Sequence, residues 1–340
     1  MKEEVHYEYR FEDRSVLLRW LQPGLFEPLV RVLPRSLTPN QITVAGQLAA
    51  GGGLALALFG RPAGPGVLVL LSAALLFYAL ADCVDGLFAR HTKQTSRLGE
   101  FLDHWLDALS VPAVVLCYGL VLPADPRLVF TATLASAFLH FATFLHGYRR
   151  GFVHLGEIGI IEATFIGAVI CLVSAVIGTG WLAAPLLGGL SAASLLLLAT
   201  LVGAFAALWS MRGLVHHLRD FTAVASLLVV VGLWYGLGRL SPALAAGLAI
   251  AVTARFEGLV IRARLVRQPL LLRDPGLAVL LAGGCATALA LDLPARGQTA
   301  LAGLALAYAA VRSGRAFSRT VAELSGQPKV ATPAGPAHKS

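Results

Sequence analysis

Long apolar segments constrain the fold of this chain more than any other feature. Ten runs are long enough to cross a bilayer as helices, and they cover 41–60, 65–86, 99–122, 126–147, 160–178, 187–210, 220–238, 241–261, 275–292 and 297–316. With 57% hydrophobic and 14% charged residues, the composition is typical of an integral membrane protein and excludes a soluble domain. A bilayer leaves no partner for an unpaired backbone group, so the sequence predicts an all-α polytopic bundle of about ten transmembrane helices.

The basic residues predict which side of the membrane each loop occupies. If the N-terminus is cytoplasmic, all but four of the 27 Lys and Arg residues fall on inner segments, the exceptions being Arg61, Arg127, Arg239 and Arg296. We therefore expect an even number of spans with both ends inside. The net charge of +8 needs no nucleic-acid partner, because arginines that face anionic lipid explain it. The excess of Arg over Lys and the abundant Ala favour a bacterial inner membrane.

Composition divides the chain into four expected parts. They are a cytoplasmic or interfacial segment (1–40), a six-span catalytic core (41–210), a four-span bundle (211–318) and a disordered cytoplasmic tail (319–340). Apolar and basic residues interleave over 15–33, which predicts two short amphipathic helices on the inner leaflet, separated at Pro23-Gly24. A soluble capping helix is the alternative. The four cysteines lack ligand spacing, so we interpret them as free core residues.

Four aspartates between 82 and 107 form the candidate site. Asp82 and Asp85 are three residues apart and Asp103 and Asp107 are four apart, so each pair projects from one side of its own helix. Acids at membrane depth are costly and by default mark a functional site. Converging carboxylates repel one another unless a cation neutralises them, and hard oxygen ligands suit magnesium or manganese. The pattern predicts a site for two divalent ions that faces a phosphate-bearing substrate. The alternative is a set of helix-end acids that only solubilise the membrane edge.

Small and basic residues surround these acids. Gly86 and Ala89 lie on the acidic face, where small side chains would let a nucleotide approach the backbone. Arg90 supplies a fixed charge for a phosphate, although positive-inside bias would also explain it. Ser96 precedes the third span and either caps that helix or donates to a phosphate.

Histidines and glutamates complete the set of candidates. His104 follows Asp103 directly and is either an ordinary membrane-edge histidine or a base beside a metal ligand. Glu162 lies at the start of an apolar run, where protonation or pairing with a basic residue would offset its cost. Glu257 is predicted to pair with a neighbouring arginine. His140 is six residues from His146 on a different helix face, so the two are not expected to share a metal.

The stretch from Asp82 to Asp107 matches D-x2-D-G-x2-A-R-x8-G-x3-D-x3-D, with every fixed position filled. It resembles the signature of the CDP-alcohol phosphotransferase family. That resemblance implies transfer of a phosphoalcohol from a CDP-linked donor to an alcohol, with release of CMP. The T-P-N-x-I-T element at 38–43 is also similar to the family and implies that Asn40 lies near the cytidine of the donor. Capping of the first span by Thr38 or Asn40 is the alternative.

Further motifs resemble the choline/ethanolamine phosphotransferase branch, which uses diacylglycerol as acceptor. They are D-R-S-V-L-L, L-P-x-x-L-T-P-N-x-I-T, G-E-F-L-D-H and G-I-I-E-A-T, and they cover roughly the first half of the chain. The branch implies that all four aspartates hold two metal ions and that Asn40 and Arg90 hold the CDP moiety. It also implies that His104 accepts the hydroxyl proton, that Glu162 raises its basicity, and that the protein is a homodimer.

Two other functions were weighed. A CDP-diacylglycerol-dependent phosphatidyltransferase would use a soluble alcohol and Asp107 as base, without needing His104 or Glu162. A transporter would spread its charges over several helices, whereas here the acids are concentrated in one motif. Leu87 and Phe88 replace the polar residues that usually follow D-G in the amino-alcohol branch, so the headgroup stays open.

Overall fold

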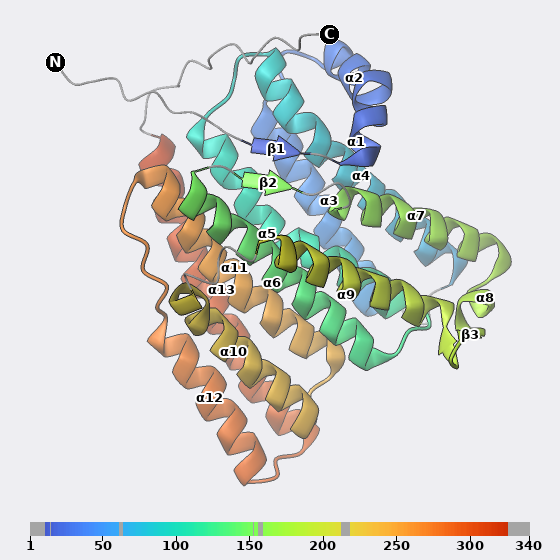
Figure 1. Cartoon of the computed structure of the whole chain (residues 1–340), viewed down its shortest axis with the longest axis vertical. Coiled ribbons are helices and arrows are strands. Elements are labelled where there is room, and N and C mark those ends of the chain that lie inside the picture. The colour runs from blue at the N-terminus through green and yellow to red at the C-terminus, as the bar shows by residue number, and fades with distance from the viewer. Residues whose placement is uncertain are drawn as a thin grey trace.

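The computed structural model describes residues 11–13, 15–60, 64–151, 153–155, 159–211 and 218–325, and they form a bundle of long helices that lie side by side (Figure 1). The predicted all-α class is therefore confirmed. The helices are α1 (Val16–Leu21), the π-helical turn η1 (Gln22–Phe26), α2 (Glu27–Val32), α3 (Pro39–Phe59), α4 (Pro65–His91), α5 (Arg97–Val121), α6 (Pro126–Arg150), α7 (Ile160–Ile177), α8 (Gly180–Ala183), α9 (Ala192–Ser210), α10 (Leu218–Leu237), α11 (Pro242–Val266), α12 (Pro275–Ala290) and α13 (Ala295–Ser325).

Eight helices of the described chain are long and apolar enough to cross a bilayer, namely α3, α4, α5, α6, α7, α9, α10 and α11. The protein is thus an integral multi-pass membrane protein. The ninth predicted run forms α12, which is apolar but has only 16 residues. The tenth run lies within α13, so the count of ten stays a prediction. Because α13 continues to Ser325, residues 319–325 of the expected disordered tail are helical, and the rest of that tail lies outside the described residues.

Side chains at the helix starts explain where several spans begin. Thr38 accepts a hydrogen bond from the backbone of Gln41, whose side chain in turn accepts from the Thr38 backbone, so a complete capping box opens α3. Ser96 caps α5 by accepting from the backbone of Gly99 at 3.0 Å. Of the two residues that could cap the first span, Thr38 does so.

The N-terminal helices pack onto α3 and α4 through a small core of their own. The predicted pair of short helices is present, but Pro23-Gly24 lies in the π-helical turn η1 and does not interrupt the helical path between α1 and α2. Phe26 and Val30 are buried in a cluster whose other members are Ile42, Ala81, Val84 and Phe88. This contact places α1 and α2 beside the end of α4 that carries the signature. Their location on the membrane surface stays a prediction.

Two short strand pairs were not predicted. β1 (Phe11–Asp13) pairs in parallel with β2 (Val153–Leu155), and β3 (Pro185–Leu187) pairs with β4 (Leu190–Ser191) in a hairpin. Gly188 and Gly189 have φ values of +58° and +80°, which the hairpin turn requires and glycine adopts without strain. Strands of two or three residues show no detectable alternation, so periodicity could not reveal them.

Helices α5 and α11 form the centre of the bundle. In their most apolar windows 78% and 72% of residues are buried, more than in any other described span. Both pack against α6, and α11 also packs against α5 and α13. At Gly258 of α11 a Cβ atom would lie 2.3 Å from the Nε1 of Trp105 on α5, so glycine allows the two helices to approach closely. The C-terminal helices are therefore joined directly to the helix that carries Asp103 and Asp107.

Candidate metal centre

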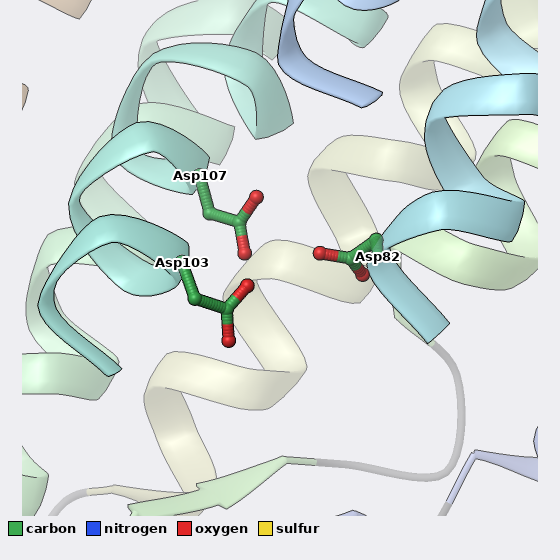
Figure 2. A group of neighbouring side chains, drawn as sticks. All are labelled: Asp82, Asp103 and Asp107. Atoms are coloured by element: carbon green, nitrogen blue, oxygen red, sulfur yellow. The ribbon is translucent and has the colours of Figure 1, made fainter. Parts of the chain in front are cut away.

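Three of the four predicted aspartates come together between α4 and α5. Figure 2 shows Asp103 and Asp107 one above the other on α5, with Asp82 of α4 facing them and all three carboxylates pointing into the same space. One oxygen from each lies within 4.8 Å of the others. All three side chains are partly buried. The i, i+4 spacing on α5 places two of these carboxylates on one stripe, and the packing of the bundle brings the third.

Asp107 is held in place by neutral donors. Its Oδ1 accepts hydrogen bonds from the Nε2 of Gln47 on α3, at 3.0 Å, and from the hydroxyl of Tyr78 on α4, at 3.1 Å. The Oε1 of Gln47 in turn accepts from the hydroxyl of Ser110. Neutral donors orient a carboxylate without removing its charge, so the ligand geometry is set before any ion binds.

Asp85 has a different environment from the other three aspartates. Its side chain is buried, and its Oδ2 accepts a hydrogen bond from the hydroxyl of Thr43 on α3. It lies one helical turn beyond Asp82, but among the described residues it is not part of the group whose oxygens converge. The expectation that all four aspartates are ligands therefore stays a prediction for Asp85.

The donor set fits a hard divalent cation. Three carboxylates that face one another at this spacing repel at the low dielectric of a membrane protein, and a bound cation would remove that cost. Two oxygens on opposite sides of one magnesium ion are about 4.2 Å apart, so oxygens within 4.8 Å of one another could share an ion after small side-chain movements. Asp82, Asp103 and Asp107 are thus the residues that could hold a metal.

The residues predicted to contact a nucleotide lie next to the glycines of the signature. A Cβ atom at Gly99 would lie 3.2 Å from the Oδ1 of Asn40, so the Asn40 side chain rests against the start of α5. A Cβ atom at Gly86 would lie 3.4 Å from an Nη of Arg90. Arg90 is exposed and Ala89 is partly buried. A side chain at Gly99 would press against Asn40 and Ser96, and the room that Gly86 and Ala89 are expected to leave for a nucleotide stays a prediction. Ser96 is used as a cap.

His104 is buried beside the cluster. Its Nε2 lies 3.7 Å from the Oδ2 of Asp103, and its ring packs against Phe144 of α6 with centroids 4.8 Å apart. Only 4% of the residue is exposed. An ordinary membrane-edge histidine would be more exposed, so the structure places His104 within the site.

Glu162 has a structural position that the sequence did not predict. Its Oε1 accepts hydrogen bonds from the Ser15 hydroxyl and the Leu17 backbone, at 2.5 and 3.1 Å, and its Oε2 accepts from the Gly159 backbone at 2.8 Å. One carboxylate thus satisfies the first turns of both α1 and α7. These three donors, and not His104, are the partners found for Glu162, so the expected effect of Glu162 on His104 stays a prediction.

A buried histidine–glutamate pair was missed. The Nδ1 of His140 on α6 lies 2.9 Å from one oxygen of Glu257 and 3.0 Å from the other, so the predicted arginine partner of Glu257 is wrong. Only 1% of the Glu257 side chain is exposed. The sequence offered one signal for His140 and Glu257, a polar residue inside an apolar run. Gln47 and Tyr78, which bond to Asp107, carry the same signal and were also not selected. The partners could not be paired from sequence, because they lie on helices far apart in the chain.

Leu87 and Phe88, which depart from the usual amino-alcohol pattern, pack away from the cluster. Phe88 is 1% exposed and lies in the core shared by α4 and the N-terminal helices, with Leu87 against the same core. These apolar residues therefore anchor α1 and α2.

Together, the helical fold and the carboxylates define a class of integral membrane proteins with an aspartate cluster that could hold a metal ion near one end of a helix pair. A model of the CDP-alcohol phosphatidyltransferase family matches residues 36–210, about half of the chain and all of the site described above. The chain belongs to this family.

Curated relatives agree with the expected branch. Cholinephosphotransferase 1 of Gallus gallus is 32% identical over 186 residues, which cover 53% of this chain and 55% of the relative. The protein of the same name from Danio rerio is 29% identical over 182 residues, or 48% of each chain. Choline/ethanolaminephosphotransferase 2 of Arabidopsis thaliana is 31% identical over 121 residues, or 33% of this chain and 30% of the relative.

Two limits follow from these matches. The matched part spans about half the length of the first two relatives. All three relatives are eukaryotic, so they give no support to the expected bacterial inner membrane.

Proposed function

We propose that this protein transfers a phosphoalcohol from a CDP-alcohol, of the CDP-choline or CDP-ethanolamine type, to diacylglycerol and releases CMP. The observation that carries the proposal is the convergence of Asp82, Asp103 and Asp107 within a segment that matches the family. The names of the relatives, cholinephosphotransferase and choline/ethanolaminephosphotransferase, support the choice of donor.

The three aspartates would hold magnesium or manganese, in the proposal as two ions with Asp85 as a further ligand. The ions would offset negative charge on the β-phosphate and on the leaving CMP. Gln47 and Tyr78 keep the Asp107 carboxylate oriented for this task. Gly86 and Ala89 would leave space for the nucleotide, and Arg90 and Asn40 would contact its phosphate and cytidine groups.

The hydroxyl of the acceptor has to lose a proton as it attacks the β-phosphorus. In this proposal His104 accepts that proton, since it is a buried imidazole beside the cluster. Asp107 would take the role in the alternative, a CDP-diacylglycerol-dependent transferase, but its hydrogen bonds to Gln47 and Tyr78 favour a ligand over a base. Glu162 is left out of the mechanism because it caps two helices.

The two substrates would reach the site from different directions. The donor is water-soluble and would enter from the cytoplasmic face, where the basic loops are predicted to lie. The acceptor is a lipid and would enter sideways from the bilayer. We also carry the homodimer as part of the proposal, on the resemblance to the family alone.

The decisive experiment is CMP release by purified protein in detergent with magnesium. CDP-choline, CDP-ethanolamine and CDP-diacylglycerol are each combined with diacylglycerol and with soluble alcohols, and Asp103→Asn serves as the blank. Turnover that needs a CDP-amino-alcohol and diacylglycerol is expected. Turnover only with CDP-diacylglycerol would establish the alternative, and no turnover with any pair would overturn both.

A further inference from the structure

The pair of His140 and Glu257 is the second buried cluster of ionisable groups close to the aspartates. His140 lies in α6 and Glu257 in α11, and both carboxylate oxygens of Glu257 are within 3.0 Å of the His140 Nδ1. Glu257 is almost fully enclosed, whereas 14% of the His140 side chain is exposed. The imidazole is therefore the more exposed part of the pair.

That imidazole lies next to the metal centre. The ring of Phe144 lies between two histidines: its centroid is 4.8 Å from that of His104 and 5.0 Å from that of His140. The three rings therefore form one contiguous group. His140 is also close enough to Asp107 for the two side chains to interact electrostatically. The order Glu257, His140, Asp107 thus leads from the C-terminal helices to a candidate ligand.

Helix α11 is fixed tightly against the helix that bears the ligands. Gly258, directly after Glu257, permits the close approach to Trp105 of α5. One turn and a half further on, Arg264 forms an ion pair with Glu100 at the start of α5. Two contacts on either side of Asp103 therefore set the distance and rotation of α11, and Glu257 cannot shift without disturbing them.

We propose that Glu257 is a positioning residue of the metal centre, which fixes the His140 ring so that the imidazole helps to balance the charge of Asp107. The inference rests on the proposed function, because it needs the aspartates to bind a metal. It gives the C-terminal helices a role, since α11 lies beyond residue 210, where the family match ends.

The physical reason is that residues that contact a metal ligand, without binding the metal themselves, also affect metal affinity. A carboxylate on one nitrogen of an imidazole fixes the ring orientation and its tautomer, and the other nitrogen can then serve the site. Loss of such a supporting partner typically lowers metal affinity or activity by about 10- to 100-fold. A pair that served only to pack α6 against α11 would lower stability and leave metal affinity unchanged.

The test is a titration of purified protein in detergent with Mn²⁺, with free Mn²⁺ followed by electron paramagnetic resonance in the absence of substrate. Glu257→Gln is expected to raise the dissociation constant by about 10- to 100-fold. His140→Ala should give the same shift, and the double variant should be no worse than His140→Ala alone. Glu257→Asp should recover part of the loss if the carboxylate itself matters.

Two controls separate the possible outcomes. Asp274→Asn breaks a buried ion pair with Arg255, which lies on α11 as Glu257 does. This variant should leave Mn²⁺ binding unchanged. Asp103→Asn should bind Mn²⁺ weakly or not at all. If the wild-type protein binds no Mn²⁺, the proposed metal centre fails. If it binds Mn²⁺ and both Glu257→Gln and His140→Ala bind it equally well, the centre stands and this inference is overturned. Should Glu257→Gln not fold, His140→Ala decides.

Discussion

The three clustered aspartates of α4 and α5 differ from Asp274 and Glu323 of the C-terminal region in what their oxygens face. Asp82, Asp103 and Asp107 have oxygens within 4.8 Å of one another. In the C-terminal helices, by contrast, Asp274 lies 3.0 Å from Arg255 and Glu323 lies 2.8 Å from Arg262. The same chemical group therefore stabilises the fold in one region and leaves charge to be neutralised by a ligand in the other.

Asp274 shows how completely a buried acid can be satisfied by the protein. One of its oxygens pairs with Arg255, and the other accepts from the Leu277 backbone at 3.2 Å and the Tyr308 hydroxyl at 3.1 Å. The contact with Leu277 caps α12, whereas Arg255 and Tyr308 tie the start of α12 to α11 and α13. No ligand is needed to offset this carboxylate, so its position carries no functional implication.

The largest effect is expected from Asp103→Asn. Loss of a direct ligand should exceed the cost of losing a supporting partner, so CMP release should fall by more than about 100-fold. With EDTA present, thermal unfolding in detergent should occur at the same temperature as for metal-free wild type or a higher one, because one of three mutually repelling charges is gone. A large fall in the unfolding temperature would contradict the comparison, since it would mean that the triad stabilises the fold.

The second largest effect is expected from removal of the metal, which should affect the aspartate cluster and not the ion pairs of the C-terminal helices. Chelation with EDTA should abolish CMP release and lower the unfolding temperature of the wild-type protein, and added magnesium should restore both. A ligand at 100 times its dissociation constant stabilises a folded protein by about 2.7 kcal/mol, which sets the size of the shift. Asp107→Asn should show a much smaller shift. An equal shift in that variant would place the ion elsewhere.

Asp274→Asn should have the opposite pattern, a loss of stability without a loss of chemistry. Breaking one partner of a buried ion pair typically costs about 3–5 kcal/mol, because the remaining charge stays buried without compensation. Turnover per folded molecule should stay within about twofold of wild type, on the additivity expected of distant sites. The exposed pair of Arg239 and Asp292 offers a control, since Asp292→Asn should change stability little.

The smallest effect is expected from Glu162→Ala. Removing a capping side chain costs about 1 kcal/mol, and here one carboxylate caps both α1 and α7. We expect a modestly lower unfolding temperature and nearly unchanged kcat. A fall in kcat comparable to that of His104→Ala would restore the catalytic role that the family resemblance implied for Glu162.

Local features of the fold were largely predictable. The apolar runs located the helices, and capping by Thr38 and by Ser96 was one of two alternatives at each position that the sequence left open. The short strand pairs were not predictable, since two or three residues show no periodic apolar pattern. The helical continuation of α13 to Ser325 was not predicted either, although Phe317, Val321 and Leu324 follow an i, i+4, i+7 pattern and pack against the core. The candidate ligands were predictable because residues three or four apart, such as Asp103 and Asp107, lie on the same face of a helix.

The sequence by itself determined the membrane class, the order of the helices and the stripe of α5 that carries Asp103 and Asp107, because helix geometry repeats every 3.6 residues whatever surrounds it. Only the tertiary structure decided the partner of each acid. It turned Asp85 to Thr43, Glu162 to the starts of two helices, and Glu257 to His140. Apart from Gly159, these partners lie 42 to 147 residues away in the chain, and contacts at such separations depend on how whole helices pack, which no local pattern encodes.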